Sequence, residues 1–534
     1  MTRAARGTAQ PVTLKRELRT LEAVGLSIGI VAPTLALSLN GVAVAGLVGR
    51  AVPLAFLFAA VGIGLAVYGF QVLAREHAHS GSVYAFTGAT LGPRPGFLAG
   101  WALFGFYLIS VPAAFAAVGF FGASFLQSTG WWSGADWLAI GLPAAVLAWA
   151  IAAARARRAT RVLLAFEIGS VLLIVILFAT IVVKILAGSA PAGASLTGHV
   201  FTLPTGTGVH AVALAAVFGF LSFAGFEGAA TLGEETSNPR RNIPRALVLS
   251  VGIAVVIFVV GMAIESWGFG ATDAGGKAFA SSGAPLQNLA SRYLTTGFGD
   301  VLTLGAAVSA FAAGIGNTAA ANRMLFALTR DAYTDRDAPH LFTRVNKSGV
   351  PSTALHVVGA IGVVIAVSLR AGGIPGDHAF FYTATIGVLS LLVAYILLNL
   401  GAARFLASAV GGLKIRALIP LLAICFLGYT LYSSVVPVPV PPGKWFPYIA
   451  GGWLLAGLAV VVLVPGLATR IGTALARDEG LEPSLVTTAS GVANSLEPVR
   501  TASDLDSSGS DAPAAAAAPA TAPAAPTPRV GGPA

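Results

Sequence analysis

Apolar runs of about twenty residues recur along almost the whole of this 534-residue sequence. A bilayer core about 30 Å thick is crossed by a helix of ~20 mostly apolar residues, because a helix satisfies its own backbone hydrogen bonds. Only 10% of the residues are charged, against roughly 25% in soluble domains. The sequence therefore predicts an all-α integral membrane protein.

The runs predict about twelve transmembrane helices, each long enough to cross the hydrocarbon core. The approximate spans are 21–46, 51–74, 96–126, 137–154, 162–186, 209–235, 246–269, 299–328, 353–370, 380–402, 417–437 and 446–468.

The basic residues predict the orientation of these spans. If the N-terminus is cytoplasmic, 26 of the 32 Lys and Arg residues fall in cytoplasmic segments, as the positive-inside rule requires. We therefore expect a multi-pass protein of the cytoplasmic membrane with both termini in the cytoplasm. The net charge of +10 follows from this topology, and we expect no nucleic acid partner.

Three regions follow from the pattern of the chain. Residues 1–20 form a polar and basic cytoplasmic segment, and residues 21–470 form the membrane domain. Residues 480–534 are rich in Ala and Pro and lack any apolar period, which predicts a disordered cytoplasmic tail.

Two of the predicted spans are interrupted. Pro33 lies near the middle of the first, and Gly219, Gly225 and Gly228 interrupt the sixth. Broken helices often bind substrate near the bilayer midplane, because their free backbone groups carry partial charges. The two breaks are five helices apart, as two five-helix repeats require. Helix packing or a simple kink is the alternative reading of either break alone.

Acidic residues inside spans form a second group of candidates, since leaving a charge in lipid costs at least ~2.5 kcal/mol. Glu227 follows the break in the sixth span, and Glu167 lies in the fifth. Either could bind a proton or cation, or could simply hydrogen-bond a neighbouring helix. Glu265 is near an outer helix end, where we expect solvation. Asn317 in the eighth span could serve packing or substrate contact.

Enzyme chemistry has little support in the sequence. It contains no zinc-protease HExxH motif and no phosphate-binding Walker loop. The single cysteine, Cys425, excludes a cysteine metal cage. We expect a protein that is not an enzyme and has no cofactor or metal.

Three motifs in order carry a family resemblance. The first is GFEGAATLGEET at 225–236, followed by NPRRNIPRA at 238–246. The second runs from SGSVY at 80–84 through LGP at 91–93 to GW at 100–101. The third is ANRM at 321–324, TRD at 329–331 and RVNKSGVP at 344–351. Over residues 20–470 the chain resembles bacterial amino acid permeases of the amino acid–polyamine–organocation superfamily.

The resemblance implies a leucine-transporter-like fold of two inverted five-helix repeats plus two further helices. Helices one to five would lie at 21–186, helices six to ten at 209–402, and helices eleven and twelve at 417–468. It also implies that the breaks in helices one and six hold the amine and carboxylate of a substrate, with helices three, eight and ten closing the pocket. By motif position, the substrate-binding residues are Ala32, Pro33, Thr34, Phe220, Leu221, Ser222, Ala224, Gly225 and Asn317.

The chain departs from its relatives at two places. Helix one lacks the usual Gly-Ser-Gly break, and Pro33 offers no amide donor. Glu167 stands about where many sodium-independent relatives have a lysine.

We therefore expect a secondary active transporter of amino acids or related amines, driven by proton symport or substrate exchange, with Glu227 and Glu167 as coupling residues. Its partners would be the small-molecule substrate, the lipid bilayer and H⁺. A polyamine or organic cation transporter, or a non-transporting sensor on the same fold, is the alternative.

Overall fold

The structure is a computed structural model that describes residues 20–76, 82–154, 157–232, 236–332, 346, 348–408, 413–439, 441–464 and 466–478. These ranges are almost wholly helical and contain no β-strand. The predictions for residues 1–19 and for the tail at 480–534 lie outside the described residues.

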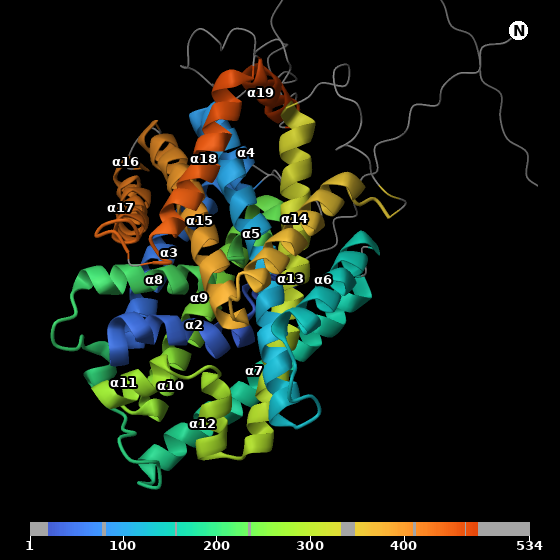
Figure 1. Ribbon diagram of the computed structural model, residues 1–534. Coiled ribbons are helices and arrows are strands. Elements are labelled where there is room, and N and C mark those ends of the chain that lie inside the picture. The colour runs from blue at the N-terminus through green and yellow to red at the C-terminus, as the bar shows by residue number, and fades with distance from the viewer. Residues whose placement is uncertain are drawn as a thin grey trace, which may run out of the picture. The chain divides into compact units, whose positions relative to one another are not determined.

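The helices that lie within the predicted apolar runs are arranged as Figure 1 shows. They are α1 (Thr20–Val31), α2 (Pro33–Val48), α3 (Val52–Glu76), α5 (Pro93–Ser128), α6 (Trp137–Ala154), α7 (Arg157–Leu186), α8 (Val209–Phe223), α9 (Pro239–Val255), α10 (Gly261–Phe269), α13 (Thr296–Ala332), α14 (Ser352–Ala371), α15 (Gly376–Ser408), α17 (Leu418–Ser433) and α18 (Trp445–Leu463).

Shorter elements connect them. They are η1 (Gly49–Ala51), α4 (Ser82–Leu91), η2 (Gly198–Phe201), the 3₁₀ segment η3 (Phe226–Leu232), the π-helical turn η4 (Val256–Val260), α11 (Asp273–Ala280), α12 (Pro285–Tyr293), α16 (Leu413–Arg416) and α19 (Leu467–Asp478).

Eleven stretches of the described chain are long and apolar enough to cross a membrane. The first, Ala23–Glu76, has 54 residues and combines two of the twelve predicted spans. As one straight helix it would extend about 81 Å, far beyond a core of about 30 Å. It is instead interrupted at Ala32 and Gly49, both of which have positive φ, so its length allows two crossings.

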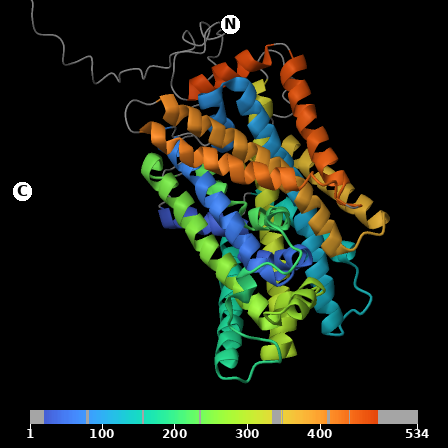
Figure 2. The same ribbon diagram turned by 90° about the vertical axis from the view of Figure 1, so that its left-hand side faces the viewer.

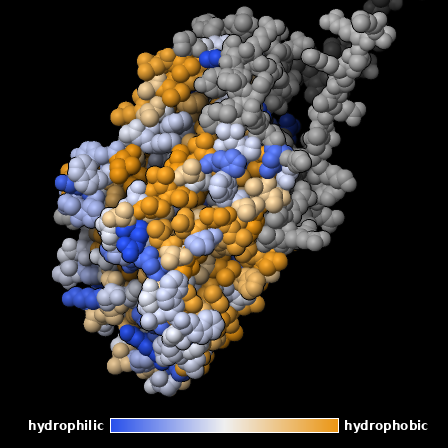
Figure 3. Space-filling model, turned by 45° about the vertical axis from the view of Figure 1, so that its right-hand side comes forward, coloured by the Kyte–Doolittle hydropathy of each residue, from blue (hydrophilic) through white to orange (hydrophobic). Residues whose placement is uncertain are grey.

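Burial separates central helices from peripheral ones. The most apolar windows of α5 and α15 are 83% and 72% buried, whereas those of α6 and α18 are each 17% buried. The central helix α5 packs directly against both α13 and α15, and Figure 2 shows α3 beside α9. Figure 3 shows a broad apolar area on one face, as a surface in contact with lipid requires.

The break within the first predicted span, 21–46, is confined to one residue. Ala32 has φ 49° and ψ 65°, in the left-handed region, between the end of α1 and the start of α2. Proline disfavours the α conformation in the residue before it and cannot donate a helical hydrogen bond. Pro33 therefore ends α1 and, at the first position of α2, begins the next helix.

Candidate functional site

The site lies where two helix breaks meet. The sixth predicted span ends as α8 at Phe223 and continues as η3 from Phe226, with Gly225 at φ 108° between them. A Cβ at Gly225 would lie 2.7 Å from Cγ2 of Ile30 and 3.1 Å from both its carbonyl carbon and the Val31 nitrogen. Only glycine combines this φ with so close an approach to the backbone of α1.

The break at Ala32 releases backbone carbonyls at the end of α1. The carbonyl of Gly29 loses its helical donor because Pro33 has no N–H. The amides of Thr34 and Leu35 would serve Ile30 and Val31, but they donate to side chains instead. The three carbonyls therefore give the end of α1 a partial negative charge.

The acceptors of those two amides come from distant helices. Thr34 N donates to Oε1 of Glu167 on α7 at 2.9 Å, and Leu35 N donates to Oγ of Ser309 on α13 at 3.2 Å. Glu167 is only 4% exposed. A carboxylate at a helix N-terminus is favoured by the free amides and the helix dipole, so Glu167 caps α2.

Glu227 fixes the second break. Its Oε2 accepts hydrogen bonds from Gly225 N at 2.9 Å and from the Tyr395 hydroxyl at 2.7 Å. Its Oε1 accepts one from the Tyr107 hydroxyl at 2.8 Å. The side chain is fully buried, and these donors join η3 to α5 and α15. Three donors provide the compensation that a buried carboxylate requires.

A short polar chain crosses from α2 to α8. Nδ2 of Asn40 donates to Oγ of Ser222 at 2.7 Å, and the Ser222 hydroxyl donates to the Phe218 carbonyl at 2.8 Å. Because the serine proton is used, Ser222 must accept from Asn40, which fixes the orientation of that amide. Oδ1 of Asn40 is then left buried, with no protein hydrogen-bond partner among the described residues.

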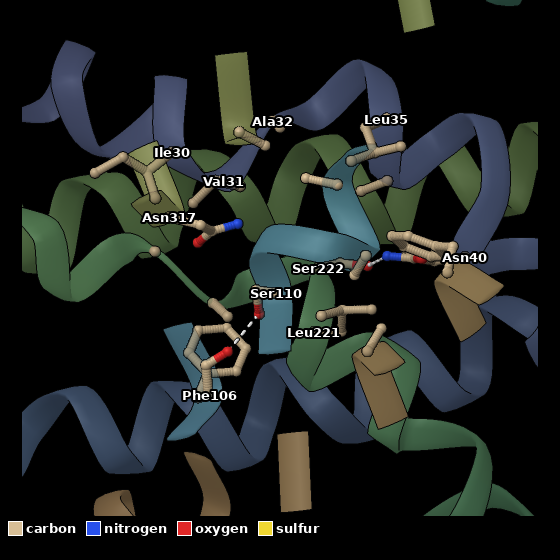
Figure 4. A pocket seen from close by; sticks show the side chains of 18 residues that line it. Ile30, Val31, Ala32, Leu35, Asn40, Phe106, Ser110, Leu221, Ser222 and Asn317 are labelled. Atoms are coloured by element: carbon tan, nitrogen blue, oxygen red, sulfur yellow. Dashed lines mark hydrogen bonds between the residues drawn. The ribbon is translucent and has the colours of Figure 1, made fainter. Parts of the chain in front are cut away.

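A cavity lies at the junction of the breaks (Figure 4). Its volume is about 60 Å³, well below the roughly 300–1,000 Å³ of typical small-molecule sites, so the cavity is nearly closed in this conformation. The described residues that line it include no acidic or basic side chain. They are Ile30, Val31, Ala32, Leu35, Ala36, Asn40, Phe106, Ser110, Ala113, Ala114, Leu221, Ser222, Ala224, Gly225, Ala313, Asn317, Phe380 and Ala384.

Six of the nine predicted substrate-binding residues line this cavity: Ala32, Leu221, Ser222, Ala224, Gly225 and Asn317. Pro33 and Thr34 belong to the buried first turn of α2 and do not line it. Phe220 points away, since its ring lies against Gly62 of α3. Glu167 and Glu227 are also absent from the lining, and each instead holds a backbone amide at one of the breaks.

Several lining residues were not predicted from the sequence. Figure 4 shows Asn40 beside Ser222 on one side of the cavity, with Asn317 near Ile30 and Val31 on the other. Phe106 and Ser110 come from α5, and the Ser110 hydroxyl donates to the Phe106 carbonyl at 2.7 Å. Asn40 was recognisable as the one amide side chain in the apolar run 33–48. Nothing in the sequence marks Phe106, Phe380 or Ala384.

The expectation that Glu265 is solvated is wrong. Glu265 is fully buried on α10, and neither carboxyl oxygen has a protein hydrogen-bond partner among the described residues. Its place near the end of a span suggested water, but α11 and α12 pack against α10 and α2 at this end.

A polytopic helical fold with a small cavity at two meeting helix breaks defines a membrane transporter. Over residues 22–464 the chain matches the family described as amino acid permease, and it belongs to that family. The family lies within the superfamily that the sequence motifs indicated.

Three relatives are similar to this chain over 48–72% of its length. An uncharacterized transporter of Mycobacterium tuberculosis is 27% identical over 369 residues, which are 68% of this chain and 74% of that protein. The branched-chain amino acid permease BcaP of Lactococcus lactis is 24% identical over 409 residues, covering 72% and 80%. BcaP of Bacillus subtilis is 28% identical over 276 residues, covering 48% and 56%.

Proposed function

We propose that this permease carries aliphatic amino acids across the cytoplasmic membrane and binds them in the cavity between the two breaks. The observation that carries the proposal is the junction itself, where the released carbonyl end of α1 meets Gly225. A partial negative charge at the edge of an apolar cavity suits a primary ammonium group.

The polar groups of the cavity favour the same part of the substrate. Oδ1 of Asn40 is a buried acceptor without a protein partner in the described chain. The Ser110 and Ser222 hydroxyls each donate their proton to a backbone carbonyl of their own helix. What they present to a ligand is therefore oxygen lone pairs. No lining residue within the described chain is basic, so an ammonium would meet acceptors and no like charge.

The apolar lining supports an aliphatic side chain. Leu35, Phe106, Leu221 and Phe380 are among the large apolar side chains that line the cavity. Two of the similar proteins are named branched-chain amino acid permeases, which agrees with that chemistry.

The carboxylate has few donors in this conformation, and this favours a second candidate. The amides of Thr34, Leu35 and Gly225 already donate within the protein, and Pro33 has none. Among the lining side chains, the donors that remain are the Nδ2 group of Asn317 and the second N–H of the Asn40 amide. An amine or polyamine without a carboxylate would need no such donors.

Proton symport or substrate exchange is the proposed driving force, with both termini in the cytoplasm. Glu167 and Glu227 are the proposed coupling residues because each carboxylate holds one of the two breaks. Loss of charge on either would weaken a hydrogen bond that fixes the binding site.

Counterflow in proteoliposomes tests the proposed substrate. We expect leucine inside the vesicles to drive uptake of labelled leucine, and 3-methylbutylamine, which lacks only the carboxylate, to drive less. If the amine alone drives exchange, the second candidate replaces the first. Ligand-dependent thermal stabilisation without flux under any gradient would instead identify a sensor and contradict transport.

A further inference from the structure

Glu265 is an acidic residue that the proposed transport mechanism leaves without a role. It lies on α10, in the last turns of the candidate span Pro239–Phe269, and is fully buried. Both carboxyl oxygens lack a protein partner among the described residues, unlike Glu167 and Glu227, which are each hydrogen-bonded.

The surroundings of Glu265 on its own helix face are apolar. One turn before it, Gly261 lies against Leu37 and Phe178, and Met262 lies against Gly41. One turn after it, Gly268 lies against Leu289 and Ile181, and the ring of Phe269 stacks on Phe279 at 4.8 Å. Residues three and four apart share a helix face, so the carboxyl sits between two apolar layers.

Four of these six contacting residues belong to α2 and α7, and the other two belong to a pair of short helices that we call the cap, α11 and α12 together. Phe279 belongs to α11 and Leu289 to α12. The cap packs on α2, α10 and α13, and Arg50 of η1 forms an ion pair with Asp273 at the start of α11. The cap therefore covers Glu265 on the side where the span ends.

Titratable and charged groups on the elements packed against α10 have other partners or lie elsewhere. Lys184 of α7 donates to the Tyr293 carbonyl, the Tyr293 hydroxyl donates to the Gly268 carbonyl, and Arg292 lies over the Phe269 ring. The other such groups whose side chains the structure describes are Glu167 on α7, Asp273 and Lys277 on α11, His199 in η2, and Tyr68, Arg75 and Glu76 on α3. None of these forms a salt bridge with Glu265.

We propose that Glu265 is a proton-binding latch, over which the cap packs only while the carboxyl carries a proton. An ionised carboxylate in this layer would have neither a counter-ion nor a donor, whereas a protonated one is uncharged. When the cap separates from α10, water reaches the carboxyl and it ionises. Proton binding and cap closure are therefore linked, and each favours the other.

The latch reaches the cavity through α2. Asn40 lines the cavity, and the next residue, Gly41, lies against Met262 of α10 and Phe279 of the cap. A change in cap packing therefore acts on the helix that carries Leu35, Ala36 and Asn40. The expected consequence is that higher pH on the cap side favours the open cap.

Single-cysteine labelling tests the latch without any assumption about the substrate or about transport. In a Cys425→Ser background, Ala290→Cys places a thiol at a fully buried position of α12. A membrane-impermeant cationic thiol reagent then reports opening of the cap in proteoliposomes. A matched protein that also carries Glu265→Gln, measured at the same pH, removes the effect of thiol ionisation on the rate.

We expect the two proteins to be labelled at equal rates near pH 5.5. Near pH 8.5 we expect the protein that keeps Glu265 to be labelled about tenfold faster than the Glu265→Gln protein, because only the former ionises and opens the cap. Equal rates at every pH would overturn the latch.

Two further variants keep the test decisive. Should Glu265→Gln not fold, Glu265→Met, which is also uncharged, replaces it with the same two outcomes. Ala148→Cys, equally buried in α6, must stay unlabelled, so that general unfolding is recognised.

Discussion

Glu167 and Thr34 are 133 residues apart in the chain, yet the Thr34 amide donates to the Glu167 carboxylate at 2.9 Å. This hydrogen bond ties the start of α2 to α7 and holds open the break at Ala32. A side chain of α7 therefore maintains the break between α1 and α2.

Removal of the Glu167 carboxylate should destabilise the protein. Glu167→Ala leaves the buried Thr34 N–H without an acceptor, which costs about 1–3 kcal/mol. Glu167→Gln keeps a carbonyl acceptor and should lose less. Thermal unfolding in detergent measures the stability of both variants. Equal stability of wild type and Glu167→Ala would show that the hydrogen bond from Thr34 N to Glu167 does not stabilise the protein.

The two tyrosines that donate to Glu227 should each contribute measurably. Tyr107→Phe and Tyr395→Phe each remove one hydrogen bond to a carboxylate, worth about 1.5–3 kcal/mol. Because both act through Glu227, their effects in a Glu227→Gln background should be smaller than in wild type. Strict additivity in this double-mutant cycle would argue against the shared network.

Coupling by Glu227 is a separate prediction. If the carboxylate titrates during transport, Glu227→Gln should shift or abolish the pH dependence of flux while the protein stays folded. Uptake measured across a pH series in proteoliposomes decides this, and an unchanged pH profile would leave Glu227 with a structural role only.

Gly225→Ala should abolish substrate binding and lower stability. Alanine at this position would have to adopt a φ of 108°, which is unfavourable for any residue with a Cβ, and that Cβ would lie 2.7 Å from Ile30 Cγ2. Gly252→Ala is the matched control, since Gly252 is helical in α9 with no neighbour within 4 Å of an added Cβ, and alanine favours helix. Wild-type ligand-induced thermal shifts in Gly225→Ala would contradict the role of the junction.

The span pattern of this protein was predictable because bilayer thickness imposes a length and composition on each helix. The positions of the two breaks were also predictable, because proline always lacks a backbone N–H and glycine always tolerates positive φ. Their meeting across the fold was inferred from family resemblance and from their matching spacing.

The side-chain directions were not predictable in the same way. Phe220 belongs to the same sequence motif as Leu221 and Ser222, which line the cavity. Its ring packs on Gly62 of α3 instead, because successive residues of a helix point about 100° apart. The prediction that Glu265 is solvated is wrong for a related reason. The sequence shows how far along the span Glu265 lies, but its burial comes from the packing of α10 against α2, α7, α11 and α12, which no local pattern reveals.

An added charge in the cavity should change its selectivity. Asn40→Asp places a carboxylate beside the proposed ammonium site, which favours ligands with more positive charge. We expect diamines to compete for leucine uptake better in Asn40→Asp than in wild type. Asn40→Leu, which is similar in size and uncharged, is the control and should not gain diamine affinity.

The most direct test of the account is leucine counterflow in a variant whose cavity is filled. Ala313 is buried on α13 and lines the cavity, so Ala313→Phe should abolish counterflow. Val301→Phe on the same helix, where the native side chain is 49% exposed, should leave it intact. Loss of counterflow in Ala313→Phe alone is the predicted result, and normal counterflow in a folded Ala313→Phe protein would contradict a binding site at the junction of the two breaks.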